Sequence, residues 1–288
     1  AMIKAIEFIK RSGGTLSGEV QVWTTVDEEA GGMGSLAIAD KGYHADGCVV
    51  TEATELNVVP IMRGILFGRM TVTGRSGLAE GDLQPHWSIG GAVDAIAKTI
   101  RIYDAIQELN KDWMKDPRKQ HPLFPPARVF PPQCNVTMID GGQNPNSFAG
   151  DCSLTYDIQY LPSEADEIGM GTKVQKEFID YVLSFCQSDL WLKLNPPKFE
   201  WTLDAAPMET SRDHPLVGTL EDSCRSLSLK TEIFGLPCWS DMANLYHLTK
   251  VPGVVFGPGE KQRTHKSDEY VSVAQLVDCC KALAIFVK

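Results

Sequence analysis

The stretch VWTTVDEEAGGMGS, residues 22–35, joins an apolar run to three consecutive acids and a glycine-rich turn. Residues 19–26 (EVQVWTTV) predict a strand, because β-branched residues and partial period-2 alternation are typical of strands. Residues 33–42 predict a helix, and residues 47–51 (GCVVT) predict a short buried strand. Strand, helix and strand at this spacing indicate a parallel α/β layer.

The acids Asp27, Glu28 and Glu29 stand where the first strand is expected to end. Adjacent carboxylates raise one another's pKa, a divalent cation relieves their repulsion, and open α/β sheets place ligand sites at this edge. Acids also favour the N-terminus of a helix, where they interact with the helix dipole. The triplet alone therefore leaves a metal site and a helix start open.

Two further residues extend the metal hypothesis. Glu52 follows the second expected strand, and it should meet Glu29 because the two strands are predicted to be parallel neighbours. His265 stands in FGPGEKQRTHKSDEY, a loop before the last helix. Each residue alone is more typical of a surface position. Together, two carboxylates and an imidazole suit Zn²⁺, and a spare carboxylate beside them suits a general base.

The composition limits the class of protein. The 288 residues are 43% hydrophobic and 22% charged, as in ordinary globular proteins. A net charge of -10 argues against a protein that binds nucleic-acid backbones, which needs a basic face. No apolar run approaches the roughly 18–20 residues of a membrane span. Eight cysteines without a CxxC pair indicate reduced thiols, so we expect a cytoplasmic protein with neither nucleic-acid nor membrane partners.

The middle of the chain predicts a second architecture, with one solvated sheet face. Its order is the split βαβ arrangement of strand, helix, strand, strand, helix and strand. The expected elements are a strand ending at Gly74, a helix at about 90–110, strands at 134–141 and 152–161, a helix near 164–187 and a strand near 198–203, with a proline-rich loop at 111–132.

After Asp204 the α/β pattern returns, with a helix near 213–227, a strand at 251–259 and a C-terminal helix at about 272–287. We therefore expect a parallel-rich α/β domain made of residues 1–60 and 205–288, which is interrupted by an α+β insert at residues 61–204.

Six segments occur in the order of a known family: VDEEAGGMGS, TEAT, GRSG with PHW, IDGGQNPNSF, YDIQYLPSE, and FGPG with HKSDEY. Over essentially the whole chain, this set resembles the co-catalytic zinc amidohydrolases and peptidases that include acetylornithine deacetylase, succinyl-diaminopimelate desuccinylase, aminoacylase and glutamate carboxypeptidase. The resemblance implies that the insert is a lid through which two subunits form a homodimer. It also implies two zinc ions per subunit, for which cobalt or manganese can substitute.

The resemblance also implies roles for single residues. Glu28 would be the general base, Glu29 would bind one zinc together with His265, and Glu52 would bind the other. Asn146 falls where members carry a substrate-binding asparagine. The implied reaction is hydrolysis of the amide bond of an N-acyl amino acid. A metallo-dipeptidase or carboxypeptidase acting on a dipeptide, and a non-catalytic dimerisation or ligand-binding relative, remain as alternatives.

Several positions depart from the family pattern. Its His-x-Asp motif and the metal-bridging Asp have no counterpart, and the first ten residues resemble the helix that follows that Asp. We therefore expect a catalytic domain that is truncated at its N-terminus. With at most three of five ligands, this chain is expected to be weakly active or inactive.

The remaining departures lie in the insert. Leu78 stands where members carry an oxyanion-binding His. His86 is nearby in the sequence and could substitute, although the resemblance favours its own position in the family pattern. Gln159 replaces a carboxylate-binding Arg, and Ala149 replaces a proline. These changes indicate an altered substrate or reduced activity.

Overall fold

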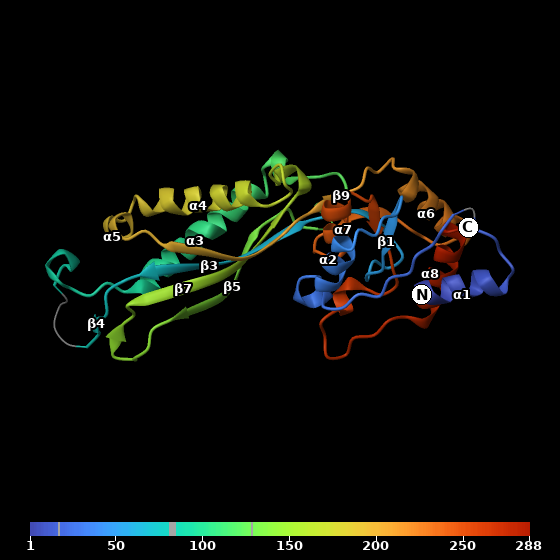
Figure 1. The fold of residues 1–288 in the computed structure, drawn as a ribbon. Coiled ribbons are helices and arrows are strands. Elements are labelled where there is room, and N and C mark those ends of the chain that lie inside the picture. The colour runs from blue at the N-terminus through green and yellow to red at the C-terminus, as the bar shows by residue number, and fades with distance from the viewer. Residues whose placement is uncertain (17, 81–84, 128) are drawn as a thin grey trace. The chain divides into compact units, whose positions relative to one another are not determined.

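The computed structural model describes residues 1–16, 18–80, 85–127 and 129–288. Residues 81–84 of the GRSGLAEGDLQPHW segment therefore lie outside the described part. The chain divides into two compact units, which Figure 1 draws as ribbons. Unit 1 comprises Ala1–Arg63 and Ala206–Lys288, and unit 2 comprises Gly64–Ala205.

Unit 1 contains a mixed five-stranded sheet in the order β1-β11-β2-β10, with β9 also paired to β2. The β1–β11 and β10–β2 pairs are parallel, whereas the β11–β2 and β2–β9 pairs are antiparallel. The strands are β1 (Cys48–Val50), β2 (Val58–Met62), β9 (Met208–Glu209), β10 (Ile233–Leu236) and β11 (Gly253–Val255). The helices are α1 (Met2–Arg11), α2 (Met33–Asp40), α6 (Pro215–Ser226), α7 (Met242–Thr249) and α8 (Val273–Phe286), with 3₁₀-helices η1 (Glu28–Ala30) and η5 (Lys261–Arg263).

Helices cover both faces of this sheet. Val58 of β2 and Val254 of β11 belong to the core with α1, α6 and α8, whereas their neighbours Val59 and Val255 belong to the core with α7. Because successive side chains of a strand point to opposite faces, a strand between two helical layers needs an uninterrupted apolar run. The predicted α/β fold class is confirmed.

The strand predicted at residues 19–26 is wrong. This segment is irregular, and none of the described residues forms a β-ladder with it. The predicted parallel neighbour of residues 47–51 is also wrong, because β1 pairs with β11 instead. A strand requires a hydrogen-bonded partner as well as a suitable sequence pattern, and the pattern alone does not identify that partner.

Unit 2 contains an antiparallel sheet in the order β5-β7-β3-β8. Helices α3 and α4 lie over one of its faces (Figure 1), and β3 alternates between buried and more exposed residues. The main elements follow one another as β3, α3, β5, β7, α4 and β8, so the predicted β-α-β-β-α-β order is confirmed. The elements are β3 (Gly64–Thr73), β4 (Gly77–Leu78), η2 (Trp87–Ile89), α3 (Ala95–Trp113), η3 (Pro117–Lys119), β5 (Cys134–Gly141), β6 (Ser147–Phe148), β7 (Asp151–Tyr160), η4 (Pro162–Glu164), α4 (Thr172–Cys186), α5 (Leu190–Leu194) and β8 (Lys198–Ala205).

Some element boundaries in unit 2 differ from the sequence prediction. The helix expected from residue 164 begins at Thr172, because the Asp166 carboxylate accepts hydrogen bonds from the N–H groups of Ile168 and Met170 in a preceding turn. Helix α3 continues to Trp113, inside the expected loop.

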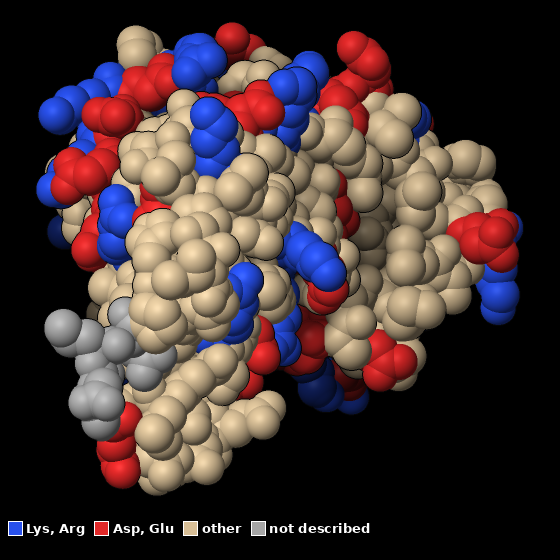
Figure 2. Space-filling view, turned by 90° about the vertical axis from the view of Figure 1, so that its left-hand side faces the viewer, with Lys and Arg blue, Asp and Glu red and all other residues tan. Residues whose placement is uncertain are grey.

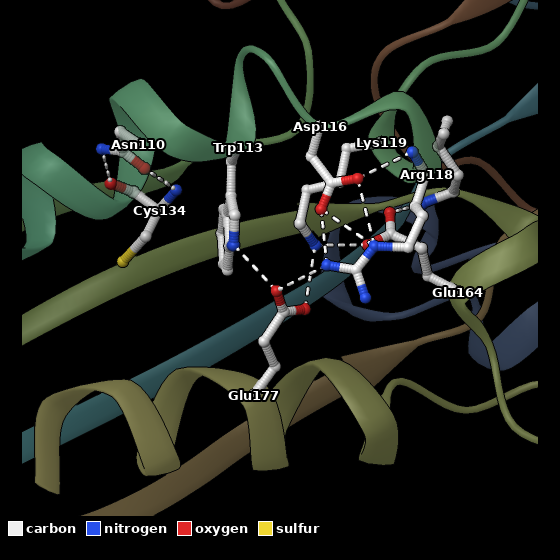
Figure 3. Close-up of polar contacts among 9 residues, drawn as sticks. Asn110, Trp113, Asp116, Arg118, Lys119, Cys134, Glu164 and Glu177 are labelled. Atoms are coloured by element: carbon white, nitrogen blue, oxygen red, sulfur yellow. Dashed lines mark hydrogen bonds and ion pairs between the residues drawn. The ribbon is translucent and has the colours of Figure 1, made fainter. Parts of the chain in front are cut away.

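A buried lysine fixes part of that loop to unit 2. The Lys119 side chain is 2% exposed, and its Nζ atom donates to the carboxylates of Glu164 and Glu177, as Figure 3 shows. It also lies 4.1 Å from the centre of the Trp113 ring. Burial raises the pKa of Glu164, and the Lys119 ammonium acts against that shift. The loop is therefore anchored by a cation that compensates a buried carboxylate.

We predict that Lys119→Met destabilises the protein by about 3–5 kcal/mol, because it leaves Glu164 buried without its cation. Urea unfolding monitored by circular dichroism measures the change. Lys111→Met is the matched control, since Lys111 forms an exposed pair with Glu108 and should have no measurable effect. Equal stability of the two variants would contradict a structural role for Lys119.

Candidate metal centre

The acidic triplet forms a tight turn. Glu28 and Glu29 lie in η1, and Asp27 before them adopts the left-handed conformation with φ 60°. The Gly32 N–H donates to the Asp27 carbonyl oxygen at 2.8 Å. A Cβ atom at Gly32 would stand 2.3 Å from Oδ1 of Asp241, so this position admits only glycine. The GG dipeptide thus brings the acidic turn against Asp241.

Asp241 anchors this turn. It is 5% exposed, and its carboxylate accepts hydrogen bonds from Ser35 Oγ at 2.7 Å and Thr25 Oγ1 at 3.1 Å. Asn244 Nδ2 donates to Ser35 Oγ at 3.0 Å. Sequence reasoning assigned no role to Asp241, because its partners lie more than 200 positions earlier in the chain.

The structure brings Glu29 and His265 together. Glu29 Oε1 lies 3.1 Å from His265 Nε2, although 236 positions separate the two residues. The backbone of His265 has φ 60°, and its N–H donates to Glu269 Oε2 at 3.2 Å. Both side chains of the pair are about three-quarters exposed. An imidazole nitrogen and a carboxylate oxygen therefore face one another at the surface.

Glu52 lies in the same electrostatic neighbourhood. Burial raises the pKa of its carboxyl to about 7, and the nearby negative charges of Glu28, Asp241 and Glu29 act in the same direction. The pKa of Glu28 is also raised, first by burial and then by the charges of Glu29 and Asp241. Glu52 follows β1, and its backbone packs closely against Gly257. A Cβ atom added at Gly257 would stand 2.3 Å from the backbone carbonyl oxygen of Glu52.

This donor set suits a divalent cation only in part. Carboxylate oxygen and imidazole nitrogen are zinc ligands, and crowded carboxylates with raised pKa values favour a positive partner. Glu29 and His265 could bind one ion between them. Within the described ranges, however, no three His, Cys, Asp or Glu side chains are grouped so that they could hold a metal ion. Binding of metal by Glu52 therefore stays a prediction.

The other candidate residues belong to unit 2. His86 is exposed and caps η2, with Nδ1 2.7 Å from Ser88 Oγ. The carbonyl oxygen of Asn146 accepts from the Ala79 N–H at 2.7 Å. Gln159 lies in β7, opposite Ile65 of β3. Their roles in substrate binding stay predictions.

Figure 2 shows a face on which Lys and Arg side chains lie among Asp and Glu side chains, with large uncharged areas between them. The coloured residues on this face form no extended basic patch. In the described part of the chain, no helix is long and apolar enough to cross a membrane.

Two curated relatives resemble most of the chain. The N-formyl-4-amino-5-aminomethyl-2-methylpyrimidine deformylase of Bacillus subtilis is 25% identical over 295 residues, which cover 98% of this chain and 67% of the relative. The acetylornithine deacetylase of Vibrio atlanticus is 26% identical over 255 residues, which cover 87% of this chain and 60% of the relative. The chain thus spans roughly two thirds of the length of the curated relatives it matches.

Solved structures share the fold. A tripeptidase from Staphylococcus aureus superposes with a TM-score of 0.72 and 17% identity, over 100% of this chain and 68% of that one. A dinuclear metal-binding peptidase of the M20 family from Bacillus subtilis superposes with a TM-score of 0.66 and 12% identity, over 99% of this chain and 69% of that one. The sequence profile described as Peptidase family M20/M25/M40 matches residues 1–288. The family resemblance is thereby confirmed, and the chain belongs to peptidase family M20/M25/M40.

Proposed function

We propose that the acidic turn, Glu52 and His265 form the reactive part of a metal-dependent amidohydrolase that removes a short acyl group from a small amine or amino acid. The observation that carries this proposal is the 3.1 Å contact of Glu29 with His265 beside the crowded Glu28 and Glu52 carboxylates. Membership of the M20 family gives the reaction class, which is hydrolysis of an amide or peptide bond.

Each residue has a separate task in this proposal. Glu29 and His265 would bind one ion and Glu52 would bind a second, with zinc as the expected metal and cobalt or manganese as substitutes. Such an ion polarises the carbonyl group of the amide when it is bound. The Glu28 carboxylate takes a proton from the attacking water and passes it to the leaving nitrogen.

The relatives support a short acyl group. The names of the two curated relatives describe removal of a formyl and of an acetyl group. Peptide hydrolysis is the second candidate, since the Staphylococcus aureus neighbour is a tripeptidase. A panel of N-formyl and N-acetyl amines, amino acids and tripeptides, assayed with added Zn²⁺ or Co²⁺, separates the two. Cleavage of tripeptides alone would reject the deacylase proposal.

For unit 2 we propose the role of a lid that pairs two subunits in a cytoplasmic homodimer. The support is the family resemblance of the insert, whose split βαβ order the structure contains. Asn146, Gln159 and His86 are the residues of this unit proposed to contact substrate.

Substitution of Glu28 tests the proposed proton transfer. We expect Glu28→Gln to lower kcat by about 10²–10⁴, because the amide cannot accept the proton, while the bound metal remains. Hydrolysis assays and elemental analysis measure the two quantities. Glu55→Gln is the matched control, since Glu55 is an exposed acid of the loop after Glu52. Loss of metal together with activity would show that Glu28 is instead a ligand.

The second prediction concerns the ligand pair. His265→Ala and Glu29→Gln should each weaken Co²⁺ binding at least tenfold, because each removes one donor atom. Visible absorption of Co²⁺ and calorimetry report this without any need for activity. His44→Ala, which removes an exposed histidine outside the pair, should leave affinity unchanged. Unchanged binding in both pair variants would place the metal elsewhere.

The third prediction concerns pH. Because the folded protein holds a proton on Glu52 up to about pH 7, the metal-free protein binds more protons than its unfolded chain between about pH 4.5 and 7. Its stability should therefore fall as pH rises through this window, on the order of 2–3 kcal/mol from this group. Glu52→Gln should reduce that slope in urea unfolding and leave the smaller contribution of Glu28, whose pKa is also raised. An unchanged slope in the variant would assign the effect to another group.

A further inference from the structure

Unit 1 contains a small cavity, of about 280 Å³, that has no role in the proposed reaction. Its walls come from the loop after β1, from the segment that contains η5 and from the loop before α8, and we call it the η5 cavity. None of the described residues that line it belongs to the acidic turn, and neither Glu52 nor His265 is among them. Its volume lies just below the roughly 300–1,000 Å³ of typical ligand pockets, so it suits a small molecule rather than a peptide or a nucleotide.

Hydrogen bonds between these segments hold the walls of the η5 cavity together. The Glu55 N–H donates to the Gly259 carbonyl oxygen at 2.9 Å, and the Gly259 N–H donates to Gln275 Oε1 of α8 at 2.8 Å. The His265 N–H donates to Glu269 Oε2 at 3.2 Å. A ligand would therefore meet walls that are already formed, which reduces the entropy lost on binding.

The floor of the η5 cavity is apolar, with Ala53, Pro258 and Val271. Gly259 lies among them and has φ 101°, a conformation that favours glycine. A Cβ atom at Gly259 would stand 3.5 Å from Ala53 Cβ and 3.7 Å from Val271 Cγ2. A side chain there would cover both residues, so glycine leaves the floor accessible to a short apolar group.

The rim of the η5 cavity carries charges of both signs. Arg263 Nε lies 3.6 Å from Glu260 Oε2, and the guanidinium carbon of Arg263 lies 4.8 Å from the centre of the Tyr270 ring. Within the described ranges, the two terminal NH₂ groups of Arg263 and Oε1 of Glu269 have no hydrogen-bond partner. A guanidinium fork binds a carboxylate through two parallel hydrogen bonds, and a carboxylate oxygen accepts from an ammonium group.

We propose that the η5 cavity binds a free α-amino acid in its zwitterionic form. Arg263 would bind the ligand carboxylate, Glu269 would bind the ligand ammonium group, and a short aliphatic side chain would lie on the apolar floor. A simple anion would meet the carboxylates of Glu260 and Glu269, and a simple cation would meet the guanidinium, so a ligand with one charge fits less well. The inference does not depend on the proposed catalytic roles.

The bound amino acid would also restrain the loop that carries His265. Glu269 accepts the His265 N–H with Oε2, so a ligand held by the same carboxylate would stabilise that hydrogen bond and the loop around it. Slower amide hydrogen exchange of residues 264–271 would therefore report an occupied cavity without any need for activity.

Calorimetric titration of the whole chain with L-valine tests the proposal, with EDTA present because amino acids chelate zinc. Two compounds match L-valine in its carbon skeleton: 3-methylbutanoate lacks the ammonium group, and isobutylamine lacks the carboxylate. We expect L-valine to bind about tenfold or more tightly than either compound, since each lacks one charge-assisted contact. L-Valine should also slow amide exchange of residues 264–271.

Arg263→Gln and Glu269→Gln should each weaken L-valine binding about tenfold or more, because each removes one charged partner. Glutamine at position 269 can still accept the His265 N–H, so the loop should keep its fold. Lys266→Gln and Asp268→Asn are the matched controls, since both residues are exposed in the same loop and do not line the cavity.

Three results would overturn the proposal. The first is the absence of L-valine binding, and the second is unchanged binding in both cavity variants, which would place the ligand elsewhere. The third is equal affinity for one of the two single-charge compounds, which would identify a plain anion or cation site instead of a zwitterion site.

Discussion

The contact between Glu29 Oε1 and His265 Nε2 is the interaction on which the proposed chemistry of unit 1 depends. It joins the turn after residues 19–26 to the loop before α8. Glu29 lies in η1 and His265 lies in the loop after η5, and close backbone approaches at two glycines pack these segments within unit 1. Gly32 allows the acidic turn to lie against the buried Asp241, and Gly257 allows the FGPG loop to lie against Glu52. A side chain at either glycine would separate the carboxylates from the imidazole.

The same packing concentrates negative charge. Asp241 is buried, and its carboxylate accepts hydrogen bonds from Ser35 and Thr25. Glu28 and Glu52 have raised pKa values because burial and neighbouring carboxylates oppose their ionisation. A bound cation would reverse that balance, since it stabilises every nearby carboxylate in its charged form. The arrangement is therefore unfavourable without metal and suited to its binding, as expected for a functional site.

Local patterns in the sequence predicted much of this structure. Apolar periodicity located α2, α8, β5 and β7 to within a few residues, and the DEE triplet marked the acidic turn that the proposed function uses. The local patterns could not predict which distant segments of the chain pair with one another. Residues 19–26 have a strand sequence but no described strand partner. β1 pairs with β11, which lies more than 200 positions later in the chain. Asp241 accepts a hydrogen bond from Ser35, which is equally distant in the sequence. The family resemblance suggested the ligand pair because ordered motifs carry long-range information that a single motif lacks.

The proposed role of Glu29 and His265 as ligands of one metal ion can be tested by anomalous X-ray diffraction at the zinc edge, from crystals of the protein grown with Zn²⁺. We expect an anomalous peak about 2.0–2.2 Å from His265 Nε2 and from a carboxylate oxygen of Glu29. A zinc peak bound by other residues, with Glu29 and His265 still in direct contact, would contradict it.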